Sequence, residues 1–316
     1  YSPAGYENTV TTTPEGWNDT PIINGVAYPT LEVDPTTYRF RLLNASNDRV
    51  MTFNLFEAKT SATLADGTVL TNEVTDSTGA VIKSEIDMVP AAAVLAADAC
   101  LAGERRPSPI LGKDGLPTGK FCTPETWPMD GRLGGVPSPA GVGPTIYQVA
   151  NESGWLPAVA TFEPTPINYV QDKGRIVVLN VDMGNSGLLL SPAERADVVI
   201  DFSQYAGKTL LVYNDSGAPV PAGDPRNDLF TGVGDQSSAG GAEDTKPGYG
   251  PNTRTMMQIK VKAAGATAPI DAVALNDSIA TAYFSDPERR PVVAQNVYDG
   301  FDGTWATLSP AEMYGD

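Results

Sequence analysis

The chain has 316 residues, of which 41% are hydrophobic, and this content is enough for the packed core of one large domain or two ordinary ones. Its net charge is -17, and so acidic a surface repels phosphate backbones and anionic lipid, which argues against nucleic-acid and membrane-surface binding. No stretch approaches the ~20 apolar residues of a membrane span, and the longest candidate, residues 91–97, is far too short.

Histidine is absent from the whole chain. Imidazole is the usual acid and base near neutral pH and the preferred nitrogen ligand of zinc, copper and non-haem iron. A nucleophilic serine activated by a histidine base is excluded for the same reason. The sequence therefore excludes imidazole-based catalysis and metal sites that depend on histidine.

The first elements predicted along the chain are a lead-in and a hairpin. Residues 1–20 are polar, begin without an initiator methionine, and predict an extended lead-in or linker in a piece of a longer polypeptide. Residues 22–23 and 26–28 are apolar and flank Asn24-Gly25, a pair that tolerates positive φ. This arrangement predicts a tight β-hairpin.

Two clear strands follow. In residues 38–43 every second residue is expected to face inward. The inward set is Tyr38, Phe40 and Leu42, and it alternates with Arg39, Arg41 and Leu43. The same alternation recurs at Met51, Phe53 and Leu55. A period of two is the pattern of a half-buried strand.

Residues 57–145 interrupt this pattern and predict a loop-rich insertion. They are rich in Gly, Pro and Ala, with a short helix expected over residues 91–102. The chain's two cysteines, Cys100 and Cys122, lie here and predict a disulfide that would contribute roughly 3 kcal/mol. Two unrelated thiols are the alternative. A paired cysteine count in an acidic, Pro/Gly-rich chain also favours export, so we expect a secreted, extracellular or periplasmic protein.

Regular strands resume after the insertion. They are expected at residues 145–150, 175–181, 196–202, 209–214 and 255–262, with Met257, Ile259 and Val261 facing inward in the last. Many short strands separated by turn residues predict an all-β antiparallel sandwich. We therefore expect a β-domain over residues 21–262, with an acidic loop over 217–253 and a linker or docking tail over 263–316.

Several segments in the same order resemble the middle cupredoxin-type domain of multicopper oxidases, the laccase, spore-coat oxidase and bilirubin oxidase group, especially its large bacterial members. The segments are residues 24–33 (NGVAYPTLEV), 38–47 (YRFRLLNASN), 148–157 (QVANESGWLP), 190–202 (LSPAERADVVIDF), 214–215 with 223–228 (GDPRND), and 252–259 (NTRTMMQI). The match covers roughly residues 20–262 apart from the insertion, which departs from the shorter laccase-type pattern.

The resemblance implies a Greek-key, cupredoxin-like β-sandwich that is one of several such domains. In three-domain members the coppers are carried by the first and last domains, while the middle domain spaces them and lines part of the substrate cleft. A blue copper site needs two histidines and a cysteine, and a trinuclear cluster uses histidines only, so neither can be built here. We therefore expect no catalytic residue, cofactor or metal in this chain, and copper-bearing cupredoxin domains as its partners.

Three sharper hypotheses concern individual residues. Glu194 is the best-placed carboxylate for glycosidase-type catalysis, but an ion pair with a neighbouring arginine or a backbone contact is the favoured reading. Met256 and Met257 are adjacent in a strand and point to opposite faces, which favours one core and one surface or interface methionine over a shared copper. Asp224, Asp228 and Asp235 could wrap a calcium ion, although a solvated loop is favoured.

The sequence thus predicts a copper-free domain of a secreted multicopper oxidase. The parent would oxidise phenolics or metal ions and reduce dioxygen to water on neighbouring domains. The alternative is a cell-surface structural or assembly subunit that keeps the sandwich without oxidase activity. His-X-His pairs and a His-Cys-His strand in flanking domains would distinguish the oxidase from the scaffold.

Overall fold

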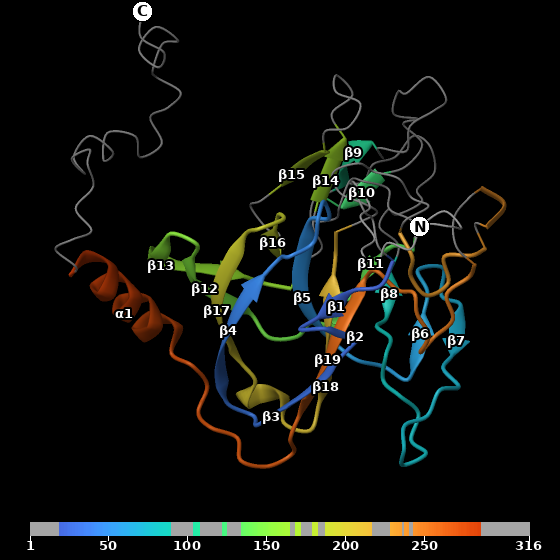
Figure 1. Cartoon of the computed structure of the whole chain (residues 1–316), viewed down its shortest axis with the longest axis horizontal. Coiled ribbons are helices and arrows are strands. Elements are labelled where there is room, and N and C mark those ends of the chain that lie inside the picture. The colour runs from blue at the N-terminus through green and yellow to red at the C-terminus, as the bar shows by residue number, and fades with distance from the viewer. Residues whose placement is uncertain are drawn as a thin grey trace, which may run out of the picture.

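Two β-sheets packed face to face form the centre of the molecule (Figure 1). The computed structural model describes residues 19–89, 104–107, 122–124, 134–164, 168–171, 179–182, 187–216, 228–235, 237–239 and 243–285. The four-stranded sheet has the spatial order β13 (Gly154–Phe162), β12 (Ile146–Asn151), β17 (Arg195–Asp201) and β4 (Thr37–Leu43). The five-stranded sheet has the order β16 (Leu188–Leu190), β5 (Met51–Glu57), β18 (Thr209–Asn214), β19 (Thr255–Val261) and β3 (Thr30–Val33).

The inner faces of the two sheets share one hydrophobic core. The inward residues of β17, Ala196, Val198 and Ile200, are buried as the alternation predicts, and they are joined by Phe202 just beyond the strand. Phe202 meets Phe40 of β4 edge to face, with ring centroids 6.2 Å apart. The predicted β-sandwich is therefore present, and its core is built from the period-two pattern.

The strand directions differ from the expected antiparallel arrangement at one place. The neighbouring strands of the two central sheets run antiparallel except β19 and β3, which pair in parallel from Gln258 opposite Thr30 to Val261 opposite Val33. A parallel pair needs a long crossover connection, and here almost the whole domain lies between the two strands. The first and last strands of this sheet are thus neighbours.

The predicted hairpin is confirmed. Strands β1 (Ile22–Ile23) and β2 (Val26–Ala27) pair with Ile23 opposite Val26. Asn24 has φ 50° and Gly25 has φ 84°, the left-handed backbone that a two-residue hairpin turn requires.

The burial of residues in strand β19 differs in part from the sequence-based prediction. Met256 rather than Met257 is the buried methionine, and Gln258, expected to face outward, is buried too. Met257 nevertheless packs against the sandwich core as predicted, and Met256 joins that core where the register with β18 shifts between Val212 and Tyr213. Gln258 is buried because the insertion covers it, and its side-chain amide donates to Lys83 O at 2.7 Å. Ile259 and Val261 are buried as predicted.

The insertion forms short strand pairs beside the sandwich. They are β6 (Ser61–Thr63) with β7 (Val69–Thr71), β8 (Met88–Val89) with β11 (Val136–Pro137), and β9 (Glu104–Pro107) with β10 (Cys122–Pro124). A 3-10 turn at Pro139–Gly141 follows. Cys100 and the helix expected over residues 91–102 lie outside the described residues, so the disulfide with Cys122 remains a prediction.

Two further strands, β14 (Asn168–Gln171) and β15 (Leu179–Asp182), pair antiparallel between β13 and β16 in the chain. The strand expected at residues 175–181 overlaps β15, and residues 172–178 lie outside the described part. Short 3-10 turns occur at Ser203–Tyr205 and Ser237–Ala239.

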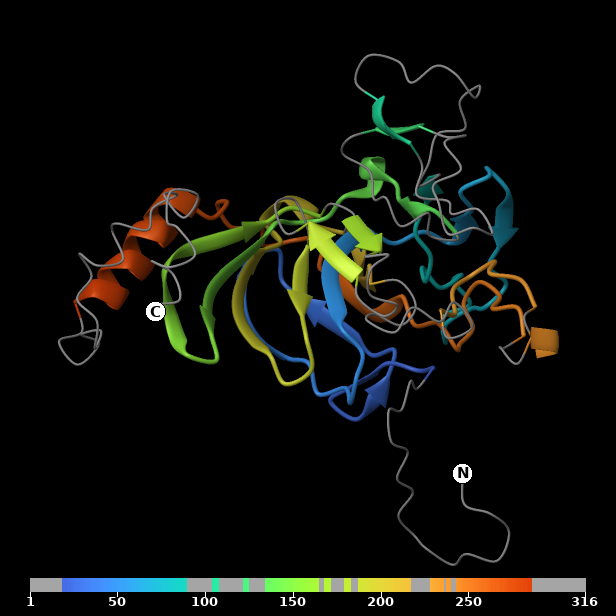
Figure 2. The same ribbon diagram turned by 90° about the horizontal axis from the view of Figure 1, so that it is seen from above.

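The segment after residue 263 contains a helix that the sequence analysis did not predict. Helix α1 (Ala272–Phe284) begins after Asp271, whose Oδ1 accepts hydrogen bonds from the N–H groups of Val273 and Ala274, each at 3.0 Å. The helix packs on β13 through Ile279, which joins Val149 and Val199 on the outer face of the four-stranded sheet. Both views place α1 at the opposite end of the molecule from β6 and β7 (Figures 1 and 2).

Candidate functional site

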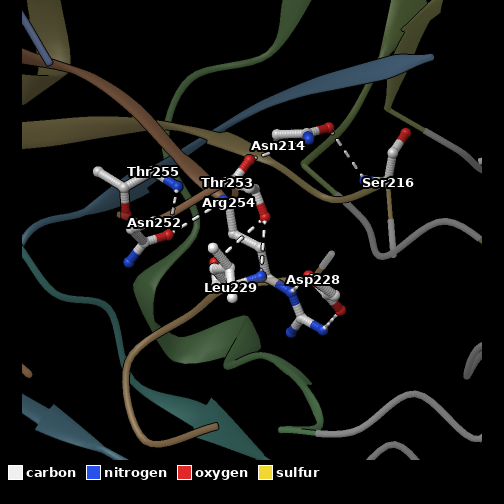
Figure 3. Close-up of polar contacts among 8 residues, drawn as sticks. All are labelled: Asn214, Ser216, Asp228, Leu229, Asn252, Thr253, Arg254 and Thr255. Atoms are coloured by element: carbon white, nitrogen blue, oxygen red, sulfur yellow. Dashed lines mark hydrogen bonds and ion pairs between the residues drawn. The ribbon is translucent and has the colours of Figure 1, made fainter. Parts of the chain in front are cut away.

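A deeply buried charge of the described structure is the guanidinium of Arg254, at the residue preceding β19. Arg254 is 2% exposed, and its Nε donates a hydrogen bond to Asp228 Oδ1 at 2.9 Å while Nη2 donates to Oδ2 (Figure 3). The guanidinium carbon lies 3.9 Å from the ring centre of Phe230. Burial opposes the charged form, but Asp228 and Tyr213 outweigh it, so the pKa of Arg254 is raised.

Backbone hydrogen bonds hold the turn that presents Arg254. The side-chain oxygen of Asn252 accepts from the N–H groups of Arg254 and Thr255, each at 3.0 Å. Thr253 binds the segment that contains Leu229. Its N–H and its hydroxyl donate to Leu229 O, and its hydroxyl accepts from Leu229 N. The turn is therefore connected through Thr253, the residue before the arginine, to the segment that carries Asp228.

Asn214, at the end of β18, ties this turn to the five-stranded sheet. Its side-chain oxygen accepts from the N–H groups of Thr52 and Ser216, at 3.0 and 3.1 Å, and its amide nitrogen donates to Thr253 O at 3.2 Å. Asn214 is fully buried, so each of these groups depends on the others for its hydrogen bonds. The Arg254 cluster, meaning Arg254, Asp228, Asn252, Thr253 and Asn214, forms one connected polar network.

The role of the Arg254 cluster is structural. An arginine stays protonated at any physiological pH, so it supplies no general acid or base. Breaking a buried pair of this kind by removing one partner costs about 3–5 kcal/mol, whereas a solvated pair contributes little. The cluster therefore fixes the loop ends next to β18 and β19 and performs no proton transfer.

Glu85 is the buried carboxylate of the insertion. It is 6% exposed, and its Oε1 accepts from Ser84 Oγ at 2.8 Å and from Gly248 N at 2.9 Å. Burial raises the pKa of Glu85, and the hydrogen bonds oppose that rise. Glu85 and Arg254 both line a small space of about 30 Å³. That volume holds about one water molecule and no substrate.

A further cavity lies beside the Arg254 cluster. It has a volume of about 570 Å³ and lies between the β1–β2 hairpin and the turn after β4. Thr253 and Met256 belong to its wall and connect it to the cluster. The sequence analysis gave no signal for this cavity, because its lining comes from segments more than 200 residues apart.

Glu194 makes the backbone contact that the sequence analysis favoured. Its Oε2 accepts from Ser191 N at 2.5 Å, and its carbonyl accepts from Asn44 N at 3.1 Å. Arg195 donates to Ala193 O at 2.7 Å. Glu194 therefore closes the turn before β17.

The structure also bears on the methionine and calcium hypotheses. Met256 is buried and Met257 is half-buried, and both pack in or against the sandwich core, which differs from the expected pair of one core and one surface or interface methionine. Asp228 is bound to Arg254, and Asp235 accepts from Ser237 N at 2.8 Å, while Asp224 lies outside the described residues. Within the described part of the chain, no group of three or more His, Cys, Asp or Glu side chains could hold a metal ion. Nor does any helix described there have the length and apolar character to cross a membrane.

Comparison with known proteins extends the sequence resemblance. No protein-family description matches the chain. A segment of 41 residues is 46% identical to multicopper oxidase LPR1 of Arabidopsis thaliana, covering 13% of this chain and 7% of that protein. The matched segment thus spans a small fraction of its curated relative.

Solved structures of multicopper oxidases align with most of the chain. The McoA multicopper oxidase of Aquifex aeolicus is 11% identical over 81% of this chain and 28% of its own, with a TM-score of 0.31. The laccase-like multicopper oxidase CueO of Ochrobactrum sp. is 15% identical over 79% of this chain and 25% of its own, with a TM-score of 0.29. The resemblance to multicopper oxidases that the ordered motifs indicate is thus also found in the 41-residue match to LPR1.

Proposed function

We propose that this chain is a copper-free, cupredoxin-like domain of a secreted multicopper oxidase, and that it holds neighbouring copper domains in position and lines part of their substrate cleft. The parent would oxidise phenolics or metal ions and reduce dioxygen to water. The observation that carries the proposal is a sequence similar to a multicopper oxidase in a chain that has no histidine at all.

The donor groups of this chain do not match copper. A blue copper site and a trinuclear cluster both depend on imidazole, which the sequence lacks. Of the soft ligands, Met256 is packed in the sandwich core, among apolar side chains. No step of the oxidase reaction is therefore assigned to residues of this chain, and the proposed role is one of geometry.

The sandwich suits a spacer because its two sheets share a tightly packed core. Val198, Phe202 and Leu210 are fully buried between the sheets. Densely packed interiors deform little and transmit strain, so surfaces on opposite sides of such a core keep their separation. The Arg254 cluster adds a buried connection between the five-stranded sheet and its long loop, which would keep a cleft wall at that end in place.

The test compares two forms of the polypeptide. The chain alone, loaded with Cu(II) and dialysed, is expected to show no thiolate-to-copper charge-transfer band and no oxygen uptake with a phenolic substrate. The longer native polypeptide that contains residues 1–316 is expected to show both, with export through the secretory pathway. A blue band in the isolated chain would overturn the copper-free assignment, and flanking domains without His-Cys-His would favour the scaffold alternative.

A further inference from the structure

Five asparagines of the chain begin the motif Asn-X-Ser/Thr, the acceptor sequence for N-linked glycosylation in a secretory pathway. They are Asn18, Asn44, Asn151, Asn214 and Asn276. A glycan is bulky and polar, so a folded protein can carry it only on a side chain that reaches solvent. Asn18 lies outside the described residues, and the structure distinguishes among the other four.

Two of these asparagines are buried inside the molecule. Asn44 is 4% exposed, and its side-chain amide donates to Arg49 O and Leu190 O, each at 2.9 Å. Asn214 is fully buried, and its amide nitrogen donates to Thr253 O at 3.2 Å within the Arg254 cluster. A glycan on either nitrogen would disrupt these hydrogen bonds and would have no path to solvent. A chain modified at Asn44 or Asn214 is therefore incompatible with this fold.

Asn276 is held between α1 and the four-stranded sheet. It is half-buried, and its side-chain oxygen accepts a hydrogen bond from Val159 N of β13 at 3.0 Å. The hydroxyl of Ser278, the third residue of this motif, donates to Ala274 O at 2.8 Å in the same helix. A glycan on Asn276 would have to be accommodated at the contact between helix and sheet, which disfavours this site.

Asn151 is the exposed asparagine of the four. It is the last residue of β12, and it pairs with Gly154 across the tight turn to β13. Its Oδ1 accepts a hydrogen bond from Ser153 N at 2.8 Å, whereas no described residue accepts a hydrogen bond from its amide nitrogen. Glu152 and Ser153 are exposed as well. A substituent on this nitrogen would therefore extend into solvent without breaking a contact of the fold.

We infer that Asn151 is the N-glycosylation site of the described chain when the protein passes through a secretory pathway that attaches such glycans. In this step the amide nitrogen of Asn151 forms a bond to the anomeric carbon of an oligosaccharide that is delivered as a lipid diphosphate. The bond from that carbon to the diphosphate oxygen breaks, the lipid diphosphate leaves, and the nitrogen loses one proton. A glycan at this turn would keep the adjoining ends of β12 and β13 in solvent, so neighbouring domains would contact other surfaces.

The inference rests on the export that is part of the proposed function, and it is independent of the copper-free assignment. The test therefore supplies a signal peptide and expresses residues 1–316 in a cultured mammalian cell line, with Asn18→Gln in every variant. The remaining motifs are then the four that the structure describes. Neither export in the native host nor copper binding affects the result.

The secreted chain is expected to carry one glycan, seen as a mass increase that peptide-N-glycosidase removes. Because this enzyme converts the modified asparagine to aspartate, peptide mass spectrometry identifies the site, which is expected to be Asn151. A secreted chain without a glycan on Asn151, or with one on Asn44, Asn214 or Asn276, would overturn the inference.

Substitutions at the turn provide matched controls. Asn151→Gln removes the acceptor and Ser153→Ala removes the hydroxyl of the motif, so both are expected to lose the mass increase completely. Ser153→Thr preserves the motif and is expected to retain the glycan. Both residues are exposed, so all three variants should be secreted with an unchanged circular dichroism spectrum. If Asn151→Gln retains the full mass increase, the glycan is elsewhere and the assignment is wrong.

Discussion

The carboxylate of Glu85 accepts a hydrogen bond from the backbone N–H of Gly248, a residue 163 positions further along the chain, at 2.9 Å. This bond joins the insertion to the loop that leads into β19. Gly248 has φ 81°, and a side chain at that position would meet the amide oxygen of Asn72 at 2.5 Å. The contact between the two segments therefore depends on a glycine on one side and a buried carboxylate on the other.

Replacing Glu85 by glutamine is expected to change the pH dependence of stability. Because burial raises the pKa of Glu85 above its ordinary value of 4.5, the folded state holds this proton more tightly than the unfolded state. The stabilisation is full below pH 4.5 and is lost as pH rises through the raised folded pKa. Glu85→Gln keeps an acceptor for Gly248 without the charge, so the decline in unfolding free energy over this window should shrink.

Urea denaturation at several pH values measures this effect. Glu85→Ala is the matched comparison, since it leaves the N–H of Gly248 and the hydroxyl of Ser84 without this acceptor. It is expected to cost about 1–3 kcal/mol below pH 4.5 and less at higher pH, where Glu85 of the wild type ionises. Identical pH profiles for wild type and Glu85→Gln would show that Glu85 does not titrate in this window.

Removing Asp228 is expected to destabilise the domain strongly. Asp228→Leu leaves the Arg254 guanidinium buried without its carboxylate, at a cost of about 3–5 kcal/mol. The double variant Asp228→Leu, Arg254→Met removes both charges and is expected to recover most of that loss. A double-mutant cycle by thermal or chemical denaturation measures the coupling. Additive effects of the two substitutions would mean that the pair contributes nothing as a unit.

Truncating the core at Phe202 is expected to cost about 3–5 kcal/mol. Phe202 is fully buried and contacts the rings of Tyr38 and Phe40 edge to face, so Phe202→Ala leaves a cavity between the sheets. Leu43→Ala, at a side chain that is 58% exposed, is the control and should stay within about 0.5 kcal/mol of wild type. Similar losses for both would contradict the described sheet packing.

Replacing the N-cap residue of α1 is expected to have a smaller and more local effect on stability. Asp271→Ala removes the acceptor for two backbone N–H groups at the start of the helix and is expected to cost about 1 kcal/mol. Asp271→Asn retains an acceptor and should lose only a few tenths. Amide hydrogen exchange over residues 272–284 localises the change. Faster exchange confined to other segments would argue against capping by Asp271.

The parts of the fold that could be predicted from the sequence are those that depend on a pattern of neighbouring residues. Tyr38, Phe40 and Leu42 alternate strictly, and Asn24-Gly25 has unambiguous turn chemistry, so both elements follow from neighbouring residues. Helix α1 was missed because Ile279 is its buried side chain while Val273 and Phe284 are exposed, which leaves no regular apolar stripe. The burial of Met256 was missed because a bulge depends on the partner strand β18, which no period in β19 itself can report. The burial of Gln258 was missed because it depends on the insertion.

The candidate sites were still harder to predict. Arg254 lies within a motif that the sequence analysis had singled out, but its burial depends on Asp228 and Phe230 in another segment. The cavity between Ile22 and Met256 exists only after the first and last strands of the sheet come together. Sites assembled from distant segments have no local signature, whereas Glu194 could be assigned because its contact is with Ser191, three residues away.

The parallel pairing of β3 with β19 has a mechanical consequence. The chain runs from the β1–β2 hairpin into the start of β3, and from the end of β19 toward α1. Tension that reaches these two strands from the two sides therefore pulls them past each other along their length. In parallel strands pulled this way, the ladder hydrogen bonds from Gln258 to Val261 are loaded together rather than one at a time. The domain would therefore resist stretching in shear, as a link that transmits force between the parts on either side of it.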